Sequence, residues 1–314
     1  MDAIKTLQQA IQHFSDDDNC IAYMVKMRWP DGVVVCPTCG RNDVSWLAKQ
    51  KKWQCKSKHT KRQFSAKVGT IFEDSPLGLD KWLMTAWMLV NCRNGVSSYE
   101  IARGIGVTQK SAWFMLHRLR LAMKSESDAP IGGNGGTVET DEVFIGGKPA
   151  NRHLGKRLGA DKKVPVIGMI DRNTREVRAK VIPNVKRESL HAQIMANIGK
   201  DTTIYTDGWI GYAHLPNVAG FVHDTVNHVD QYVKGQVHTQ GIENFWSLLK
   251  RTLNGTYVAV EPFHLDAYVD EQVFRFNNRQ NKNDEQRFKK VLSQVAGKRL
   301  TYAEVTGKVG EKRF

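Results

Sequence analysis

The order of apolar runs after residue 136 constrains the fold of this chain more than any other feature. Strand-like runs and one helical run alternate there. Their approximate bounds are 137–145, 163–171 and 176–183 for strands, 187–198 for the helix and 202–206 for a further strand. Three strands, a helix and another strand predict an α/β domain whose helices pack on a sheet. A stretch rich in Gly, Ser and Asp precedes these runs and predicts a linker over 125–136.

One acidic residue lies on the first strand-like run of this region, a second lies at the end of a later run, and a third opens a helix. They are Asp141, Asp207 and Glu243. The order of elements is that of the ribonuclease H type of α/β domain, and ligands of such sheets gather at strand ends. Carboxylate oxygens suit Mg²⁺, and two such ions about 4 Å apart activate an attacking oxygen and stabilise a leaving oxygen at a phosphodiester. We therefore expect a two-metal phosphoryl-transfer site.

Helical geometry places Glu243 beside the apolar side of its helix. At about 100° per residue, one stripe is apolar and a second, roughly 100° away, is polar. The apolar stripe consists of Ile242, Phe245, Trp246, Leu249 and Leu253, and the polar one of Glu243, Ser247, Lys250 and Asn254. A metal-binding carboxylate and a lysine that holds DNA phosphate would then share one exposed face.

Each acid taken singly also has a structural explanation. Asp207-Gly208 is a common turn dipeptide, and a glutamate near the start of a helix complements the helix dipole. The joint placement of the three acids within one α/β domain favours the catalytic interpretation.

The segment from Val33 to Phe64 consists of short strand-like pieces with cysteines at the turns and little apolar content. Cys36-Pro-Thr-Cys39 has the spacing of a metal knuckle. The second pair is irregular, because Lys58 cannot ligate a metal and His59 is the nearest donor after Cys55. We expect a structural Zn²⁺ site, with a degraded site or buried apolar cysteines as alternatives. The expected ligands are Cys36, Cys39, Cys55 and His59, whereas Cys20 and Cys92 lie outside the ligand spacing.

Eight Lys or Arg residues and no acidic residue lie between Lys49 and Lys67, interleaved with Trp53 and Phe64. Such a run is often only a solvated face, but on a zinc ribbon it predicts a surface for phosphate contacts. The residues expected to make these contacts are Lys51, Lys52, Lys61 and Arg62.

Helical patterns fill residues 79–123. Leu79 to Asn91 is apolar and aromatic at helical spacing, Ser97-Ser-Tyr-Glu100 is a capping box, and Thr108 caps another helix after a glycine-containing turn. This pattern predicts a helix-turn-helix, although such hairpins also occur in proteins that never touch DNA. The expected base contacts are Gln109, Lys110 and Trp113, the phosphate contacts Arg118 and Arg120, and the inward residues Ala112, Leu116 and Leu119.

Charge and composition favour a nucleic-acid partner. The 314 residues carry 46 Lys and Arg against 32 Asp and Glu, a net charge of +14, although charge alone does not separate DNA from RNA or a membrane surface. The sequence has neither a signal-peptide pattern nor an apolar run near the roughly 20 residues of a membrane span, and its few cysteines fit a reducing compartment. We expect a cytoplasmic protein without membrane contact.

Several motifs resemble the IS1595 (ISXO2-like) insertion-sequence transposases. They are Gly69-Thr-Ile-Phe-Glu-Asp-Ser before Lys81-Trp82, Thr140-Asp-Glu-Val-Phe-Ile-Gly-Gly-Lys148, Tyr205-Thr-Asp-Gly-Trp-Ile-Gly-Tyr212, His238-Thr-Gln-Gly-Ile-Glu-Asn-Phe-Trp-Ser-Leu-Leu-Lys-Arg251, Leu265-Asp-Ala-Tyr-Val-Asp-Glu and Phe274-Arg-Phe-Asn-Asn-Arg279. The resemblance covers most of the chain. It implies a DDE transposase of the prokaryotic nucleoid, dependent on Mg²⁺ or Mn²⁺, that binds terminal inverted repeats and target DNA as a homodimer or larger complex.

On this resemblance, Asp141, Asp207 and Glu243 match the acidic triad of the family. Lys250 matches the basic residue seven positions after the last acid, and Arg251 is expected to contact DNA beside it. Lys58 departs from the family pattern, which has a ribbon cysteine there. Some relatives carry another residue in place of the last acid.

The expected organisation has five parts. They are an N-terminal helix and zinc ribbon over 1–68, a helix-turn-helix region over 69–124, the linker over 125–136, a ribonuclease H-like catalytic domain over 137–290 and a C-terminal tail over 291–314. We expect an active transposase that cleaves DNA strands and transfers them to target DNA. The alternatives are a transposase-derived DNA-binding regulator without catalysis and a ribonuclease H-like nuclease.

Overall fold

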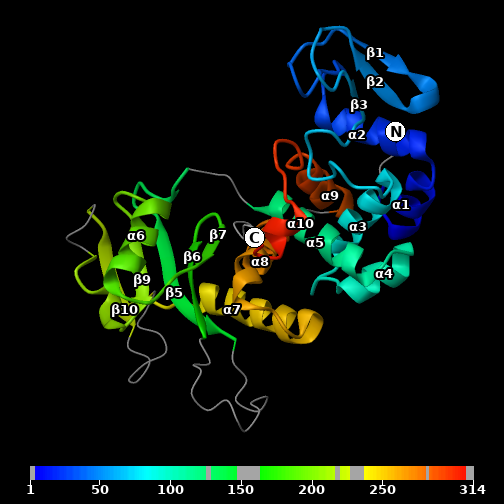
Figure 1. Cartoon of the computed structure of the whole chain (residues 1–314). Helices are drawn as coiled ribbons and strands as arrows, with labels where there is room; N and C mark the ends of the chain where they lie inside the picture. The colour runs from blue at the N-terminus through cyan, green and yellow to red at the C-terminus, as the bar shows by residue number, and fades with distance from the viewer. Residues whose placement is uncertain are drawn as a thin grey trace, which may run out of the picture. The chain divides into compact units, whose positions relative to one another are not determined.

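The computed structural model describes residues 4–124, 129–146, 163–215, 220–226, 237–280 and 283–308. The chain forms two compact units (Figure 1): unit 1 contains residues 1–123 and 280–314, and unit 2 contains residues 124–279. The catalytic domain expected from the sequence covers 137–290, whereas residues 280–290 group with unit 1. Residues 125–128 of the expected linker and 309–314 of the expected tail lie outside the described residues.

Unit 2 is built on a five-stranded sheet in the order β10-β9-β5-β6-β7. The strands are β5 (Thr137–Ile145), β6 (Val164–Asp171), β7 (Val177–Val181), β9 (Thr203–Asp207) and β10 (Val222–Val226). The first three pair antiparallel, while β9 runs parallel to β5 and β10 runs parallel to β9. The mixed α/β domain expected from the sequence is confirmed.

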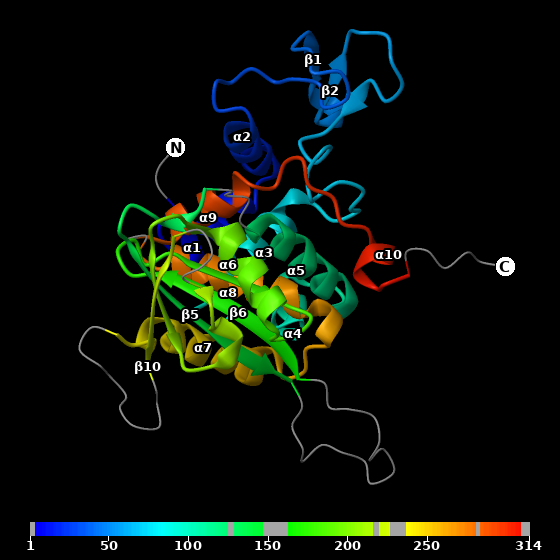
Figure 2. The same ribbon diagram turned by 90° about the vertical axis from the view of Figure 1, so that its left-hand side faces the viewer.

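Helices cover both faces of this sheet, and Figure 2 shows α6 (Arg187–Asn197) lying over one of them. Leu190 and Ile194 of α6 are fully buried in one core cluster with Val138 and Ile204 of the strands. On the other face, the apolar stripe of α7 (Gln240–Thr252) shares a second core cluster with strand residues and with α8 (Leu265–Asn277). In β5 and β6, residues on the two sides of the strand therefore belong to different cores.

Short elements complete unit 2. They are the paired strands β4 (Ile131–Gly132) and β8 (Ile198–Gly199), the 3₁₀ turns Ile210–Tyr212 and Pro262–His264, and a π-helical turn Leu253–Tyr257 after α7. Part of the expected linker is thus a strand, because Ile131–Gly132 pairs with β8. The backbone amides of Gly132 and Gly133 also donate hydrogen bonds to the Asp171 carboxylate and the Thr202 hydroxyl.

Unit 1 is mainly helical. Its helices are α1 (Leu7–Phe14), α2 (Asp17–Arg28), α3 (Leu79–Asn91), α4 (Ser98–Ile105), α5 (Gln109–Met123), α9 (Asp284–Leu292) and α10 (Tyr302–Val305). Phe288 of α9 packs its ring 5.2 to 5.6 Å from the rings of Phe14, Tyr23 and Trp87. The C-terminal region therefore completes the core formed by the N-terminal helices.

The helical pair α4–α5 follows the sequence expectation closely. Ser97 and Glu100 form the capping box, Gly106 ends α4 in the left-handed conformation at φ 65°, and the Thr108 hydroxyl accepts from the Ser111 amide. The three residues expected to face inward from α5 are fully buried: Ala112, Leu116 and Leu119.

The ribbon is a three-stranded antiparallel sheet of β1 (Val44–Leu47), β2 (Lys52–Cys55) and β3 (Gln63–Phe64), with a 3₁₀ turn Ala48–Gln50. Its apolar core centres on Trp53, whose ring lies 4.6 to 5.8 Å from those of Trp29, Trp46 and Phe64. In the described residues, no helix is both long and apolar enough to cross a bilayer.

Candidate zinc cluster and catalytic site

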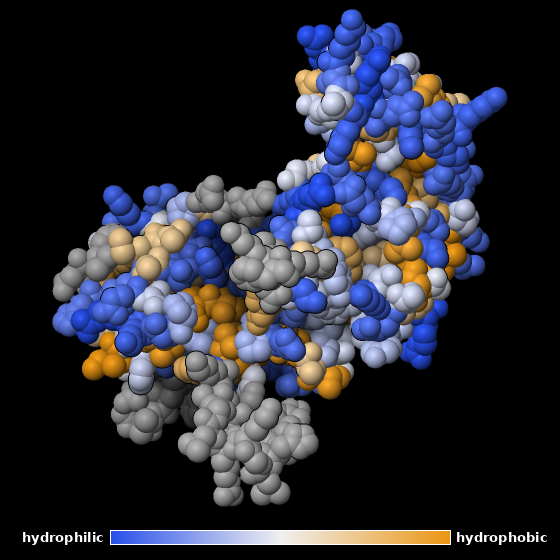
Figure 3. All heavy atoms as spheres, in the orientation of Figure 1, coloured by the Kyte–Doolittle hydropathy of each residue, from blue (hydrophilic) through white to orange (hydrophobic). Residues whose placement is uncertain are grey.

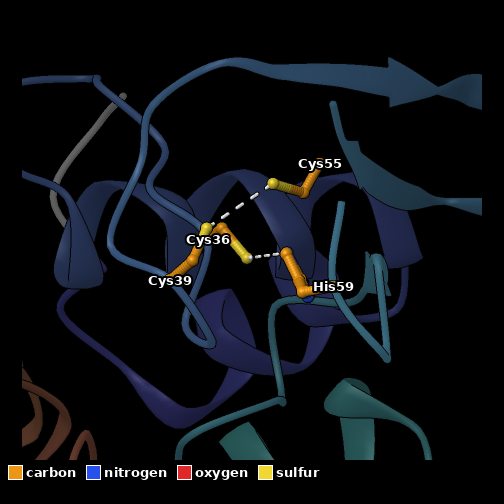
Figure 4. A group of neighbouring side chains, drawn as sticks. All are labelled: Cys36, Cys39, Cys55 and His59. Atoms are coloured by element: carbon orange, nitrogen blue, oxygen red, sulfur yellow. Dashed lines mark hydrogen bonds between the residues drawn. The ribbon is translucent and has the colours of Figure 1, made fainter. Parts of the chain in front are cut away.

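The four residues expected to bind zinc come together at one end of the ribbon (Figure 4). Ligand atoms of Cys36, Cys39, Cys55 and His59 all lie within 4.8 Å of one another. The Cys36 Sγ lies 3.5 Å from the His59 Nε2, and the Cys39 Sγ lies 3.7 Å from the Cys55 Sγ. Three thiol sulfurs and one imidazole nitrogen form a donor set that Zn²⁺ takes in tetrahedral sites.

The chemistry of His59 fits this role. Its Nδ1 lies 2.6 Å from the backbone oxygen of Thr60, which only accepts, so Nδ1 carries the proton and Nε2 offers its lone pair to the cluster. Burial raises the pKa of the Cys55 thiol, but hydrogen bonds to its sulfur outweigh this effect and lower the pKa to about 6. A metal-binding sulfur must be deprotonated, so this shift favours ligation. His59 thus supplies the fourth donor, which Lys58 cannot supply.

On the face drawn in Figure 3, hydrophilic side chains cover most of the ribbon, which is the upper part of the picture. Lys52, Lys61 and Arg62 are exposed. Lys51, by contrast, forms ion pairs with Asp17 and Asp18 at 3.0 and 2.7 Å. These two acids compete with a phosphate for Lys51, and the expected phosphate contact stays a prediction.

Two of the expected phosphate contacts in α5 are internal. Arg118 is 6% exposed and donates hydrogen bonds to the backbone oxygens of Ile71, Glu73 and Leu300, and Arg120 is 1% exposed. A phosphate cannot reach either guanidinium group, so both expectations are corrected: Arg118 satisfies the carbonyl groups of unit 1 instead. This interior position escaped the sequence reasoning because the acceptors come from distant parts of the chain.

The expected base-contacting residues lie in the first part of α5. Lys110 is exposed and its Nζ lies 4.8 Å from the ring centroid of Tyr302. Gln109 donates a hydrogen bond to the Ser98 hydroxyl at 2.8 Å, and the half-buried Trp113 ring lies 4.4 Å from that of His117.

The register of the sheet brings Asp141 and Asp207 together. Glu139 of β5 pairs with Tyr205 of the parallel strand β9, and each aspartate lies two residues further along its own strand. The period of two residues puts both side chains on the face covered by α7. The two carboxylates lie close enough for the charge of Asp207 to raise the pKa of Asp141.

Burial, together with the charges of Glu142 and Asp207, raises the pKa of Asp141 to about 7. The Trp246 Nε1 opposes this rise by donating a hydrogen bond to the Asp141 Oδ2 at 3.0 Å. Two neighbouring carboxylates repel each other when both are ionised, and a bound divalent cation would relieve this repulsion. Hard cations such as Mg²⁺ and Mn²⁺ take such oxygen ligands, so this pair fits them.

Sequence reasoning missed the neighbours of these aspartates. Glu142 points to the opposite face of β5, where the Tyr212 hydroxyl donates to its carboxylate, and burial raises the pKa of Glu142. Gly168, paired with Asp141 across the sheet, leaves space for the Trp246 ring: a β-carbon at this glycine would lie 2.5 Å from the ring. The alternation of strand residues signals the opposite orientation of Glu142, but no local pattern signals the Gly168–Trp246 contact.

Glu243 lies in the first turn of α7, is exposed, and accepts a hydrogen bond from the Thr239 hydroxyl at 3.0 Å. Lys250 and Arg251, also exposed, lie in its last turn. Glu243 and Lys250 of the polar stripe are therefore both exposed, as the helical spacing predicts. Among the described residues, only the ribbon cluster brings three or more His, Cys, Asp or Glu side chains around one metal position. Glu243 is therefore not gathered with the two aspartates in this way.

Comparison with known families identifies the class of protein in which a zinc ribbon precedes an α/β domain of this kind. Residues 134–277 match the ISXO2-like transposase domain, and residues 15–60 match the transposase zinc-ribbon domain. The chain belongs to the IS1595 (ISXO2-like) family of transposases. The resemblance noted from the sequence motifs is confirmed.

Two relatives agree with this assignment. An uncharacterized protein in the transposable element ISH50 of Halobacterium salinarum is 29% identical over 262 residues, which cover 78% of this chain and 85% of the relative. An uncharacterized transposase-like protein of Haemophilus influenzae is 32% identical over 103 residues, which cover 33% of this chain and 82% of the relative.

Proposed function

We propose that this chain is a DDE transposase of an insertion sequence. It binds the terminal inverted repeats of its element, cleaves DNA strands with the aid of Mg²⁺ or Mn²⁺, and transfers the freed 3′-hydroxyl to target DNA. The placement of Asp141 and Asp207 side by side on parallel strands is the observation that supports catalysis. A regulator that only binds DNA has no need of two crowded, partly buried carboxylates beside a tryptophan donor.

The topology of unit 2 supports a ribonuclease H-like catalytic domain. An antiparallel meander, β5 to β7, is extended on the β5 side by two parallel strands, and helices cover both faces. Asp141 on the central strand and Asp207 at the end of its neighbour are the proposed metal ligands, with Glu243 of α7 as the third. The metal ions supply charge stabilisation at the attacking and leaving oxygens.

The remaining surface supports DNA binding. Lys52, Lys61 and Arg62 on the ribbon carry exposed positive charge, and Lys110 does so at the start of α5, the proposed recognition helix. Lys250 lies two turns of α7 beyond Glu243, about 10 Å along the axis, where it would hold a phosphate next to the reacting one. Zn²⁺ bound by the ribbon cluster would hold the small ribbon in shape.

The proposed assembly is a homodimer or larger complex in the prokaryotic nucleoid, because joining two element ends requires two sites. Incubation of the purified protein with inverted-repeat DNA and Mg²⁺, followed by mapping of the nicked ends and joined products, tests the proposal. Nicks at the element ends and strand-transfer products are expected. Binding without nicking would make the chain a regulator, and nicking without joining would make it a nuclease.

A further inference from the structure

We propose that Glu139 is a positioning residue, which caps the start of α7 from the sheet and thereby sets the position of Glu243 relative to the aspartate pair. This inference rests on the proposed function, in which Glu243 is the third acid. Glu139 is fully buried on β5, two residues before Asp141 and on the same face.

Glu139 takes over the task of the helix cap. Its Oε2 accepts a hydrogen bond from the backbone amide of Ile242 at 3.1 Å, in the first turn of α7. The preceding Thr239 makes no side-chain capping bond and instead donates its hydroxyl to the Glu243 Oε1 at 3.0 Å. Because a carboxylate from the sheet satisfies the helix amide, the threonine hydroxyl is available to orient Glu243.

Gly241 makes this approach possible. A β-carbon at Gly241 would lie 2.7 Å from the Glu139 Oε2, closer than packed atoms allow, and at a tight 3.2 Å from its carboxyl carbon. Glycine is otherwise a poor helix residue. The close approach of the Glu139 carboxylate to the helix backbone gives a physical reason for glycine at this position.

Arg172 holds the other side of the Glu139 carboxylate. Its Nε donates to the Glu139 Oε1 at 2.7 Å, and its Nη2 donates to the backbone oxygen of His238 at 2.8 Å. The same Nη2 lies 2.8 Å from the His238 Nδ1; because a guanidinium only donates, this Nδ1 accepts. The 3.6 Å approach of Nδ1 to Glu139 is therefore not a hydrogen-bonded ion pair. One buried ion pair thus ties β5 to the residues on both sides of the α7 start.

Two contacts together fix the register of α7 on the sheet. Glu139 accepts from Ile242, and Asp141 accepts from the Trp246 Nε1 at 3.0 Å. Four helix residues span about 6 Å, and two strand residues span about 6.8 Å, so the two spacings match when α7 runs along β5. A slip of one helix residue would turn Glu243 by about 100° and shift it by about 1.5 Å.

A buried ion pair is weak support for stability, since apolar replacements of such pairs are often as stable, and its best-attested use is to specify register. The apolar stripe of α7 already packs on the sheet through Phe245 and Leu249. We therefore assign Glu139 to the placement of Glu243 rather than to holding α7 in the fold.

The test is Mn²⁺ affinity, measured by electron paramagnetic resonance titration of the full-length protein. The variants are Glu139→Gln, Glu243→Gln and their combination, with Glu188→Gln on the exposed start of α6 as the matched control. Glutamine fits the space, but its amide oxygen can accept from only one of the two donors. Loss of such a supporting contact lowers metal affinity about 10-fold to 100-fold, so Glu139→Gln should show this loss and Glu188→Gln none.

The combined variant separates positioning from an independent effect. If Glu139 acts through Glu243, then Glu139→Gln/Glu243→Gln binds Mn²⁺ no more weakly than Glu243→Gln alone. Additive losses would overturn the inference. Wild-type affinity and cleavage in Glu243→Gln would instead refute the third acid of the proposed function.

Gly241→Ala provides a second variant in case Glu139→Gln does not fold. Alanine favours the helix, so α7 should form, while its β-carbon displaces the Glu139 carboxylate. We expect unchanged circular dichroism and end-DNA binding, with the Mg²⁺ concentration for half-maximal cleavage raised about 10-fold or more. An unchanged Mg²⁺ requirement in this variant, with Glu243→Gln defective, would show that Glu139 does not position Glu243.

Discussion

The indole of Trp246 donates a hydrogen bond to the carboxylate of Asp141 at 3.0 Å, joining α7 to β5 at the proposed metal site. This contact stabilises the charged form of an aspartate whose pKa is otherwise raised by burial and by its acidic neighbours. We expect Trp246→Phe to keep the packing and to leave the buried Asp141 without this donor. The free energy of unfolding should fall by roughly 1–3 kcal/mol, measured by urea denaturation, and Mn²⁺ affinity should fall with it. Unchanged affinity would mean that the contact does not support the site.

Gly168→Ala tests the space on which that contact depends. Its β-carbon would lie 2.5 Å from the Trp246 ring and 2.8 Å from the Ile242 side chain, both on α7. Overpacking of this kind should cost roughly 1–3 kcal/mol of stability and reduce cleavage by displacing α7. Gly255→Ala is the control, since nothing lies within 4 Å of a β-carbon there. Equal effects of the two changes on urea midpoints and cleavage rates would refute the steric argument.

The ribbon should lose its shape without zinc. We expect about one Zn²⁺ per chain by elemental analysis, as four donors complete one tetrahedral site. Cys39→Ser should lower this content and expose Trp53, seen as a shift of tryptophan fluorescence. Cys92→Ser lies outside the cluster and should leave both measurements unchanged. A purified protein without bound zinc would contradict the four-ligand assignment.

Lys61 and Lys51 differ in their neighbours although both lie in the basic run. Lys61 is exposed, whereas Lys51 is held by Asp17 and Asp18. Removing one phosphate contact reduces the slope of log affinity against log salt by about 1, so Lys61→Ala should flatten the slope for end DNA and Lys51→Ala should not. The reverse result would place the DNA on the other side of the ribbon.

Arg118 should matter for folding rather than for DNA. Replacing it with methionine leaves the backbone oxygens of Ile71, Glu73 and Leu300 without this donor. The loss should be roughly 1–3 kcal/mol of unfolding free energy, with an unchanged salt slope of DNA binding. Arg103→Met, at an exposed position of α4, is the matched control and should be near neutral. An altered salt slope in Arg118→Met would restore a phosphate role for this residue.

Local patterns predicted the local structure well. The apolar periodicity gave Leu79–Asn91 as a helix with these bounds, and the capping residues marked where α4 and α5 begin. Ligand spacing identified His59 as the fourth member of the cysteine cluster, because all four residues lie within 24 positions of one ribbon. Such features depend on residues that are close together in the sequence, so they can be predicted from the sequence.

Features that depend on distant contacts were not predictable. The Ile71 amide bonds to the Val295 oxygen, and Phe288 enters the core of α1 to α3, yet neither end of these contacts carries a signal of the other. Arg118 looked like a surface charge because its acceptors come from other segments. The burial of Glu139 was not predictable for the same reason, because its hydrogen-bond donors, Arg172 and the α7 amide, lie 33 and 103 residues away in the sequence.

Cleavage of labelled inverted-repeat DNA by Asp141→Asn and Asp207→Asn tests whether the paired aspartates hold the catalytic metal ions. With Mg²⁺ present, each variant should bind the end DNA nearly as the unmodified protein does and should cleave no strand, because an amide cannot replace the charged metal ligand. Cleavage at the normal rate by either variant would contradict the two-metal site.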